Sequence, residues 1–240
     1  MSEATAAPAI AFFDVDNTLL RGASLYHLSV GAWRRRLITG RDVASFAWKQ
    51  ARFLMVGENG VHLASIRERA LEVVVGYTRA DLVALSTEIV DARLLQRLWP
   101  ETVAVARAHL KAGREVWLVS ATAQEVADVI AERLGLTGAL GTRLEAVDGV
   151  FTGRLMDGVC HGAQKARAAT IQAAISGADL AGCWAYSDSH NDIPLLDLVG
   201  NPVVVNPDAT LRRYAAARHW PVMILKRRSI TAATRASKKR

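Results

Sequence analysis

Two acidic residues, Asp14 and Asp16, directly follow the apolar run IAFF at residues 10–13. In an extended chain, side chains two positions apart point to the same side, so both carboxylates can lie near one site. One carboxylate there can act as a nucleophile while the other transfers protons. A solvated turn uses the same residue types, so the pair on its own leaves both interpretations open.

Further polar groups follow later apolar runs or open the helices after them. Ser120 follows EVWLV, and its hydroxyl, together with backbone N–H groups at a helix start, would seat a phosphate. Lys165 lies near the start of another predicted helix, where its charge would neutralise a phosphoryl group. Alone, Ser120 is better explained as a helix cap, and Lys165 is explained as easily by a surface charge.

The last group is SDSHND at residues 187–192, which places Asp188 and Asp192 after the run CWAY. Asp14 and Asp188 would supply two of the oxygen ligands that Mg²⁺ prefers and leave room for waters and a phosphate oxygen. A zinc site would use His190, but no Cys/His spacing of a zinc site supports it. The order and placement of all the groups together indicate a site for phosphate and metal.

The elements that carry these residues alternate between strands and helices. Short apolar runs predict buried parallel strands at Ile10–Val15, Glu115–Val119, Cys183–Tyr186 and Val203–Val205. Helical patterns lie between them, at Glu101–Ala112, Ala123–Leu134 and Gly162–Ile175. Thr122 and Glu125 predict a capping box at the start of the second helix. This alternation predicts an α/β fold whose parallel sheet is covered on both faces.

Two segments depart from the alternation. Residues 24–99 show helical spacing with no strand-like run, which predicts a helical subdomain inserted after the first strand. Its helices are expected at Ser24–Leu37, Arg41–Val56, Val61–Val75 and Thr78–Trp99. Arg143–Leu155, with Asp148-Gly149 at its centre, predicts a β-hairpin that forms a small flap on the main sheet.

Length and composition fit an ordinary globular protein. The chain has 240 residues, 51% of them apolar and 22% charged, which fits one or two domains. Its two cysteines, Cys160 and Cys183, lack metal or redox spacing and are expected to be buried thiols. No apolar run reaches the roughly 18 residues needed to span a bilayer, and the first ten residues lack the features of a secretory signal. We therefore expect a cytoplasmic location.

The basic charge is concentrated at the C-terminal end. The formal net charge is +7, and residues 226–240 (KRRSITAATRASKKR) hold seven Lys and Arg residues and no acid. The remaining residues are formally neutral. We expect a flexible tail, Lys226–Arg240, that makes a weak contact with an anionic membrane, at about 1 kcal/mol per basic residue near the surface. No aromatic residue interleaves these charges, so specific nucleic-acid binding is not expected.

In this order, DVDNT, Ser120, Lys165 and SDSHND resemble the four motifs of the haloacid dehalogenase (HAD) superfamily, most closely its phosphoserine phosphatase-like branch (HAD subfamily IB). The resemblance covers the chain from about Ile10 to Tyr214. It implies a Rossmann-like, doubly wound α/β core over residues 9–21 and 100–225, an all-helical cap over 22–99, and a basic tail over 226–240.

The resemblance also implies roles for the acidic pair. Asp14 would be the nucleophile that forms an aspartyl-phosphate, and Asp16 would protonate the leaving alcohol and then activate water. Dehalogenases lack an acid two positions after the nucleophile and P-type pumps carry Thr there, so Asp16 implies a phosphatase. The residues that would bind the phosphoryl group are Ser120, Ala121, Lys165 and Asn191.

The implied cofactor is Mg²⁺. Asp14, the backbone carbonyl of Asp16 and Asp188 would bind it, and Asp192 would lie beside the metal or orient Lys165.

One position departs from the phosphoserine phosphatase pattern. That branch usually has a Glu nine residues after the nucleophile, where it reads the substrate's amino group, and here Ala23 occupies the position. The substrate is therefore expected to be another phosphomonoester, either a small phosphorylated metabolite or a lysophospholipid-like molecule. The candidate substrate-reading residues in the cap are Ser24, Tyr26, His27 and Arg52.

Two alternatives stay open at this point. The chain would instead be a membrane- or nucleic-acid-binding module that acts through its basic tail, or a phosphotransferase on the same core. The full set of catalytic residue types favours an enzyme over a binding module. A phosphotransferase differs from a hydrolase only in the acceptor, which the sequence does not specify.

Overall fold

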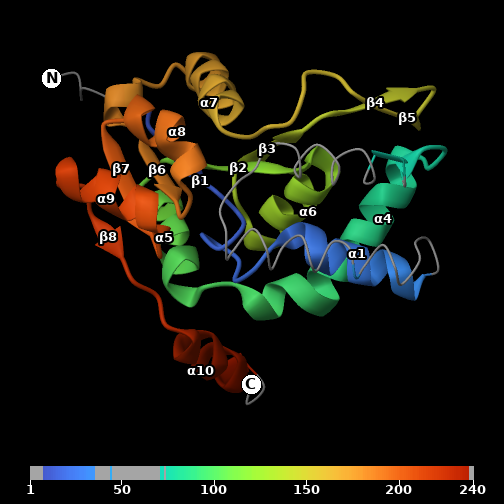
Figure 1. Cartoon of the computed structure of the whole chain (residues 1–240), viewed down its shortest axis with the longest axis horizontal. Helices are drawn as coiled ribbons and strands as arrows, with labels where there is room; N and C mark the ends of the chain where they lie inside the picture. The colour runs from blue at the N-terminus through green and yellow to red at the C-terminus, as the bar shows by residue number, and fades with distance from the viewer. Residues whose placement is uncertain (1–7, 36–43, 45–70, 73, 238–240) are drawn as a thin grey trace, which may run out of the picture.

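The computed structural model describes residues 8–35, 44, 71–72 and 74–237. Its centre is a six-stranded sheet in the order β3-β2-β1-β6-β7-β8, with all neighbouring strands parallel (Figure 1). The four predicted strands all lie in this sheet. The strands are β1 Ile10–Phe13, β2 Glu115–Ala123, β3 Gly138–Thr142, β6 Trp184–Ser187, β7 Asn201–Val205 and β8 Val222–Met223.

Two strands of the sheet, β3 and β8, have no clear signal in the sequence. The sequence of β3, GALGT, has two glycines and no run of β-branched residues, and β8 has only two residues. The glycine at the start of β3 has a packing reason, because a Cβ at Gly138 would lie 2.6 Å from the ring of Trp117. The close approach of β3 to Trp117 of β2 therefore explains the glycine at position 138, although glycine is unfavourable in strands.

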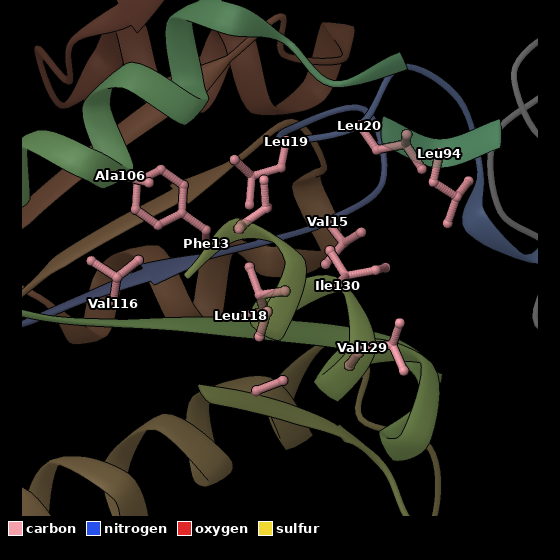
Figure 2. Close-up of a cluster of buried hydrophobic side chains, with 14 of the residues drawn as sticks. Phe13, Val15, Leu19, Leu20, Leu94, Ala106, Val116, Leu118, Val129 and Ile130 are labelled. Carbon is pink, nitrogen blue, oxygen red and sulfur yellow. The ribbon is translucent and has the colours of Figure 1, made fainter. Parts of the chain in front are cut away.

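Helices cover both faces of the sheet, and alternate residues of β1 point to each face. Phe13 packs in a buried cluster with residues of α5 and α6, including Ala106 and Ile130 (Figure 2). Phe12 packs on the other face with residues of α7, α8 and α9, including Ala169. The helices are α5 Pro100–Lys111, α6 Gln124–Leu134, α7 Ala163–Ser176, α8 Ile193–Leu198 and α9 Ala209–Ala217. This is the predicted doubly wound arrangement.

The predicted capping box at the start of α6 is wrong. The N-cap residue of α6 is Ala123, and no side chain caps the helix. The reason is that β2 continues to Ala123, so Thr122 belongs to the strand, and its N–H is bound to the Ser120 hydroxyl at 3.2 Å. Thr122, which the local pattern predicts as a helix cap, is therefore part of strand β2.

The predicted hairpin is confirmed, with β4 at Leu144–Val147 and β5 at Val150–Leu155. Asp148 and Gly149 both have positive φ, as a two-residue hairpin turn of this kind requires. The hairpin also contacts the helical segment, because the Phe151 N–H donates to the Tyr77 carbonyl at 2.9 Å and the Arg79 N–H donates to the Gly149 carbonyl at 3.0 Å. The hairpin and the start of helix α4 (Arg79–Ile89) are therefore joined by backbone hydrogen bonds.

The described part of residues 22–99 is helical. Helix α1 spans Ser24–Arg34, and α4 spans Arg79–Ile89 with a capping box formed by Thr78 and Asp81. The chain continues through a π-helical turn, η1 Val90–Leu94, and a 3₁₀ turn, η2 Leu95–Arg97. Most residues of the predicted helices at 41–56 and 61–75 lie outside the described residues, and so does Arg52. The division into core, cap and tail remains a prediction.

The basic C-terminal segment differs from the expected flexible tail, since Arg227–Ser237 form helix α10. This helix packs against α5 and η2. Lys226, Arg227 and Arg228 at its start are exposed. Across the described residues, no helix has both the length and the apolar character to cross a membrane.

Candidate active site

Parallel strands bring the predicted site residues to one edge of the sheet. Asp14 follows β1 and Asp188 follows β6, and these two strands are direct neighbours. Ser120 lies in β2, on the other side of β1. In open sheets of this kind, ligands bind at the carboxyl ends of the strands. Residues far apart in the sequence therefore meet because their strands end at the same edge.

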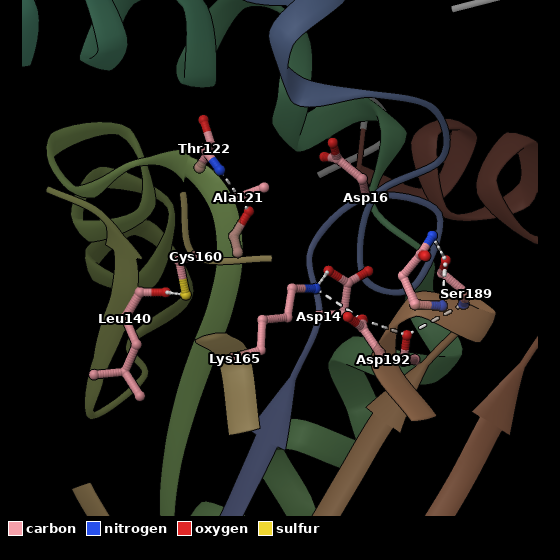
Figure 3. A network of polar contacts seen from close by, with 12 residues as sticks. Asp14, Asp16, Ala121, Thr122, Leu140, Cys160, Lys165, Ser189 and Asp192 are labelled. Carbon is pink, nitrogen blue, oxygen red and sulfur yellow. Dashed lines mark hydrogen bonds and ion pairs between the residues drawn. The ribbon is translucent and has the colours of Figure 1, made fainter. Parts of the chain in front are cut away.

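Lys165 connects two of the acids across this edge. Its Nζ donates to Asp14 Oδ1 at 2.6 Å and to Asp192 Oδ2 at 2.7 Å (Figure 3). All three side chains are buried, with Asp14 6%, Lys165 4% and Asp192 1% exposed. Burial alone would lower the pKa of Lys165, but the charges of Asp14 and Asp192 raise it above its ordinary value. Lys165 is therefore a fixed cation among the acids.

Helix α7 positions Lys165 as its third residue. The N-cap residue, Gly162, has a positive φ of 55°, and its carbonyl accepts from the Lys165 N–H at 3.0 Å. The side chain then reaches inward toward β1 (Figure 3). A lysine that looks like a surface charge in the sequence is thus placed inside the site by the position at which its helix begins.

The Asp14 carboxylate has an unusual environment. Burial raises its pKa to about 7, against the opposing effect of Lys165, and the charges of Asp192 and Asp16 raise it further. Its backbone N–H donates to the Tyr186 carbonyl at 2.9 Å, which fixes the residue against β6. Burying a carboxylate in this way costs free energy, and groups with such shifted pKa values are found most often at functional sites.

Ser187 is a buried site residue that the sequence reasoning did not single out. Its hydroxyl donates to Asp192 Oδ2 at 2.7 Å, the same oxygen that Lys165 contacts. Asp192 thereby has two donors on Oδ2, while its Oδ1 is buried with no partner among the described residues. The available signal was weak, since Ser187 is simply the first residue of SDSHND and the last of β6.

Asp16 is held apart from this network by the start of α1. Its Oδ1 accepts from the Ser24 N–H at 2.9 Å. Burial raises the pKa of Asp16, and the hydrogen bond from the Ser24 N–H partly opposes that effect. Asn17 makes the turn possible with a φ of 60°, a left-handed conformation that Asn tolerates better than most residues. A carboxyl with a raised pKa is suited to donating a proton.

Ser120 lies where the pairing of β2 with β3 is irregular. Val119 pairs with Leu140, whereas Ala123 pairs with Thr142, so β2 has extra residues between these pairs. Bulges of this kind re-aim side chains beside active sites. Ala121 at the same bulge is exposed, and its carbonyl accepts from the Thr142 hydroxyl at 2.7 Å. The Ser120–Thr122 segment therefore leaves regular strand geometry, and Figure 3 shows Ala121 and Thr122 on this part of β2.

Asp188 and Asn191 lie in the loop between β6 and α8. Burial raises the pKa of Asp188, and the charges of Asp14 and Asp192 raise it further, which indicates that these carboxylates lie close together. The side-chain amide of Asn191 donates to the Ser189 hydroxyl at 3.1 Å. In this structure Asn191 thus contacts Ser189 of its own loop. Its role at the phosphate stays a prediction.

The donor set fits a hard divalent cation. The three acids Asp14, Asp188 and Asp192 lie near Lys165, and Asp192 Oδ1 has no partner among the described residues. Mg²⁺ prefers such oxygen ligands and needs only one or two carboxylates. No group of three or more His, Cys, Asp or Glu side chains in the described residues is arranged as a metal cage. The predicted set, which uses two side chains and the Asp16 carbonyl, does not require one.

The residues at the start of α1 are less polar than those at the strand ends. Ala23 is the N-cap of α1, and the first turn of the helix has no acid. His27 is buried, with its Nδ1 unpartnered among the described residues, and burial with the charges of Arg97 and Arg93 lowers its pKa to about 4. Tyr26 is exposed, and its ring lies edge-on to His27 at 5.3 Å.

Comparison with known proteins gives this arrangement a family. Residues 11–197 match the haloacid dehalogenase-like hydrolases. The chain is also 48% identical over 215 residues to phosphoserine phosphatase SerB1 of Mycobacterium tuberculosis, an alignment that covers 89% of this chain and 70% of that protein. The chain belongs to the haloacid dehalogenase-like hydrolase family.

This HAD hydrolase is also similar to a relative named for another substrate and to a solved structure of unknown function. It is 30% identical over 224 residues to a histidinol-phosphatase of Neisseria meningitidis, an alignment that covers 90% of this chain and 99% of that protein. A Bordetella pertussis protein of unknown function has the same fold, with a TM-score of 0.78 and 29% identity, covering 90% of this chain and 98% of that one. These findings confirm the predicted fold and family, with its phosphoserine phosphatase-like branch, and support the predicted enzyme class, a HAD-type phosphatase.

Proposed function

We propose that this HAD hydrolase is a Mg²⁺-dependent phosphomonoesterase that acts through an aspartyl-phosphate on Asp14. The observation that carries the proposal is the buried Asp14 carboxylate at the end of β1, bound by Lys165 at 2.6 Å. The membership in the HAD hydrolase family supports the same chemistry.

The first step uses both members of the acidic pair. Lys165 holds Asp14 Oδ1, so we assign the attack on phosphorus to Oδ2. As the Oδ2–P bond forms, the bond between phosphorus and the alcohol oxygen breaks, and Asp16 donates its proton to that oxygen. Ser120, the backbone at Ala121, and Lys165 would bind the phosphoryl oxygens, whose charge the lysine partly neutralises.

The second step reverses the role of Asp16. Now ionised, it takes a proton from water as the water oxygen attacks phosphorus, and the Asp14 Oδ2–P bond breaks to release phosphate. The hydrogen bond from the Ser24 N–H keeps Asp16 in place for both steps. Mg²⁺, bound by Asp14, Asp188 and the Asp16 carbonyl, would supply the positive charge that allows an anionic phosphate to approach an anionic nucleophile.

Replacing the nucleophile tests the proposal most directly. We expect Asp14→Asn to lower hydrolysis of an aryl phosphate with Mg²⁺ by at least about 10³-fold, since the substitution removes the carboxylate that would form the covalent intermediate. Asp197 is an exposed carboxylate on α8, so Asp197→Asn is the matched control and should retain activity. Equal activity of the wild type and Asp14→Asn would contradict the nucleophile assignment.

The substrate class we propose is a small phosphorylated metabolite. The two relatives are named for different phosphomonoesters, those of serine and of histidinol, and the first turn of α1 offers no acid to read an amino group. A panel with phosphoserine, histidinol phosphate and lysophosphatidate, ranked by kcat/KM, would distinguish these possibilities. No contact of the described residues favours a lipid substrate or a membrane partner, so neither belongs to the proposal.

A further inference from the structure

Asp208, at the start of α9, connects two parts of the molecule through its two carboxylate oxygens. Oδ1 accepts from the N–H groups of Thr210 and Leu211, at 2.9 and 2.8 Å, and so caps the helix. Oδ2 accepts from the backbone N–H of His190 at 2.7 Å and from its ring Nδ1 at 3.0 Å. A helix cap needs only the first of these oxygens.

The backbone of Asp208 adds a further contact to the same loop. Its N–H donates to the Asp188 carbonyl at 2.9 Å. The loop from Asp188 to Asp192 is therefore held by Asp208 at two points, Asp188 and His190. Since a carboxylate only accepts, the His190 Nδ1 carries a proton in this contact.

The segment that presents Asp208 is itself fixed to the sheet. Asn206, just after β7, has a φ of 43°, and its N–H donates to the Met223 carbonyl of β8 at 2.8 Å. The Asn206 side chain accepts from the Leu225 N–H, also at 2.8 Å. Asp208 thus joins the loop to a part of the core that is held independently of the active site.

We propose that Asp208 is a positioning residue for the metal site, which sets the place of the Asp188 carboxylate by fastening the loop that carries it. This inference rests on the proposed function, because it assumes that Asp188 binds Mg²⁺. Asp208 touches neither substrate nor the reacting atoms. Partners of this kind, one step removed from a metal ligand, typically change metal affinity or activity by about 10- to 100-fold when they are replaced.

Substitutions of Asp208 can distinguish its contacts with His190 from its role as the cap of α9. Asp208→Asn keeps one oxygen for the cap, and Asn is as good a cap as Asp. Its amide nitrogen, however, cannot accept from the two His190 donors. Asp208→Ser likewise retains a capping oxygen and loses the contacts to His190, so it provides a second variant if the first folds poorly.

The experiment is calorimetric titration of Mg²⁺ into the metal-free full chain without substrate. We expect Asp208→Asn and Asp208→Ser to bind Mg²⁺ about tenfold more weakly than the wild type, with the melting temperature in EDTA nearly unchanged. His190→Ala retains the backbone donor and should weaken binding less. In turnover, saturating Mg²⁺ should restore most of the kcat of Asp208→Asn.

Asp197→Asn is the matched control, because Asp197 also joins α8 to α9, through the Tyr214 hydroxyl at 2.5 Å, without contacting the loop. Mg²⁺ binding by the Asp208 variants within twofold of the wild type would overturn the inference, as would equal weakening by Asp197→Asn. A wild type that binds no Mg²⁺ would overturn the inference and the metal part of the proposed function together. Loss of the phosphatase chemistry itself would show separately, in the Asp14→Asn comparison.

Discussion

The carboxyl edge of the sheet and the start of α1 differ in how their buried polar groups are partnered. At the sheet edge, Lys165 has two carboxylate partners and Ser187 donates to one of these acids as well, although Asp192 Oδ1 has no partner among the described residues. At the start of α1, Ala23 has no polar side-chain atom and the His27 Nδ1 has no partner among the described residues. The charged groups at the sheet edge therefore hold one another in place, whereas His27 and Ala23 form no such network among the described residues.

Under the proposed function, this difference separates the groups that carry out the chemistry from the groups that recognise the substrate. Groups that transfer phosphoryl must keep one geometry, and hydrogen bonds within the core hold them in it. Groups that read a leaving alcohol need only fit one substrate, and the relatives are named for two different ones, the phosphates of serine and of histidinol. Ser24 is the exception, because it belongs to α1 yet binds Asp16.

Replacing Lys165 should produce the largest change after the loss of the nucleophile. Lys165→Met leaves Asp14 and Asp192 buried without their cation, so we expect kcat/KM for an aryl phosphate to fall about 10³-fold. Breaking a buried ion pair should also lower the free energy of unfolding by about 3 kcal/mol. Steady-state kinetics and urea denaturation measure the two effects. Lys111→Met, a substitution at an exposed position of α5, is the control and should show neither effect. Wild-type activity of Lys165→Met would contradict the role proposed for Lys165 at the sheet edge.

The bond between Ser24 and Asp16 can be removed without altering the helix. Ser24 is the first residue of α1, where proline is tolerated, and Ala23 has an extended backbone that suits a residue before proline. Ser24→Pro removes the N–H donor, whereas Ser24→Ala keeps it. We expect Ser24→Pro to lower kcat about tenfold for alkyl phosphates, whose leaving groups need a proton.

Aryl phosphates provide the internal control for this prediction, because their leaving groups depart with little protonation and should be affected less. Ser24→Ala should resemble the wild type with both substrates. Equal losses with alkyl and aryl phosphates would show that Ser24 does not act through Asp16.

The smallest expected effects concern stability and compare two buried histidines. His109 bonds the Tyr186 hydroxyl at 2.8 Å, whereas the His27 Nδ1 has no partner among the described residues. His109→Phe should therefore lower the free energy of unfolding by about 1–2 kcal/mol, and His27→Phe should change it by less. Denaturant unfolding at pH 7.5 measures both, and a larger loss for His27→Phe would contradict the contrast.

The same histidines predict how stability depends on pH. Burial lowers the pKa of each to about 4 in the folded chain, and the ordinary value is 6.5. Between these values the unfolded chain binds protons that the folded chain does not, so their contribution is complete above about pH 6.5 and is lost as pH falls toward 4. Replacing His109 by Phe should flatten that decline relative to its own value at pH 7.5.

Local patterns identify the residues that carry charge and the strands that end beside them. Asp14 and Asp188 are recognisable because acids follow apolar runs, and the parallel sheet brings the ends of those runs together. Lys165 is recognisable by its position near the start of a predicted helix. The hairpin is equally recognisable, since Asp148-Gly149 is a turn sequence that needs little help from the rest of the fold. By contrast, the pattern at Thr122 predicts a helix cap that does not form, because pairing with β3 keeps that residue in β2.

The sequence by itself determined the order of the catalytic residue types, the alternation of strands and helices, and the absence of an acid at Ala23. These features are local, because each depends on a residue and its near neighbours. Only the tertiary structure decided that Lys165 would lie between Asp14 and Asp192, that Ser24 would bind Asp16, and that Asp208 would fasten the loop carrying Asp188. Such contacts join residues distant in the chain, and their formation depends on where strands and helices end in space.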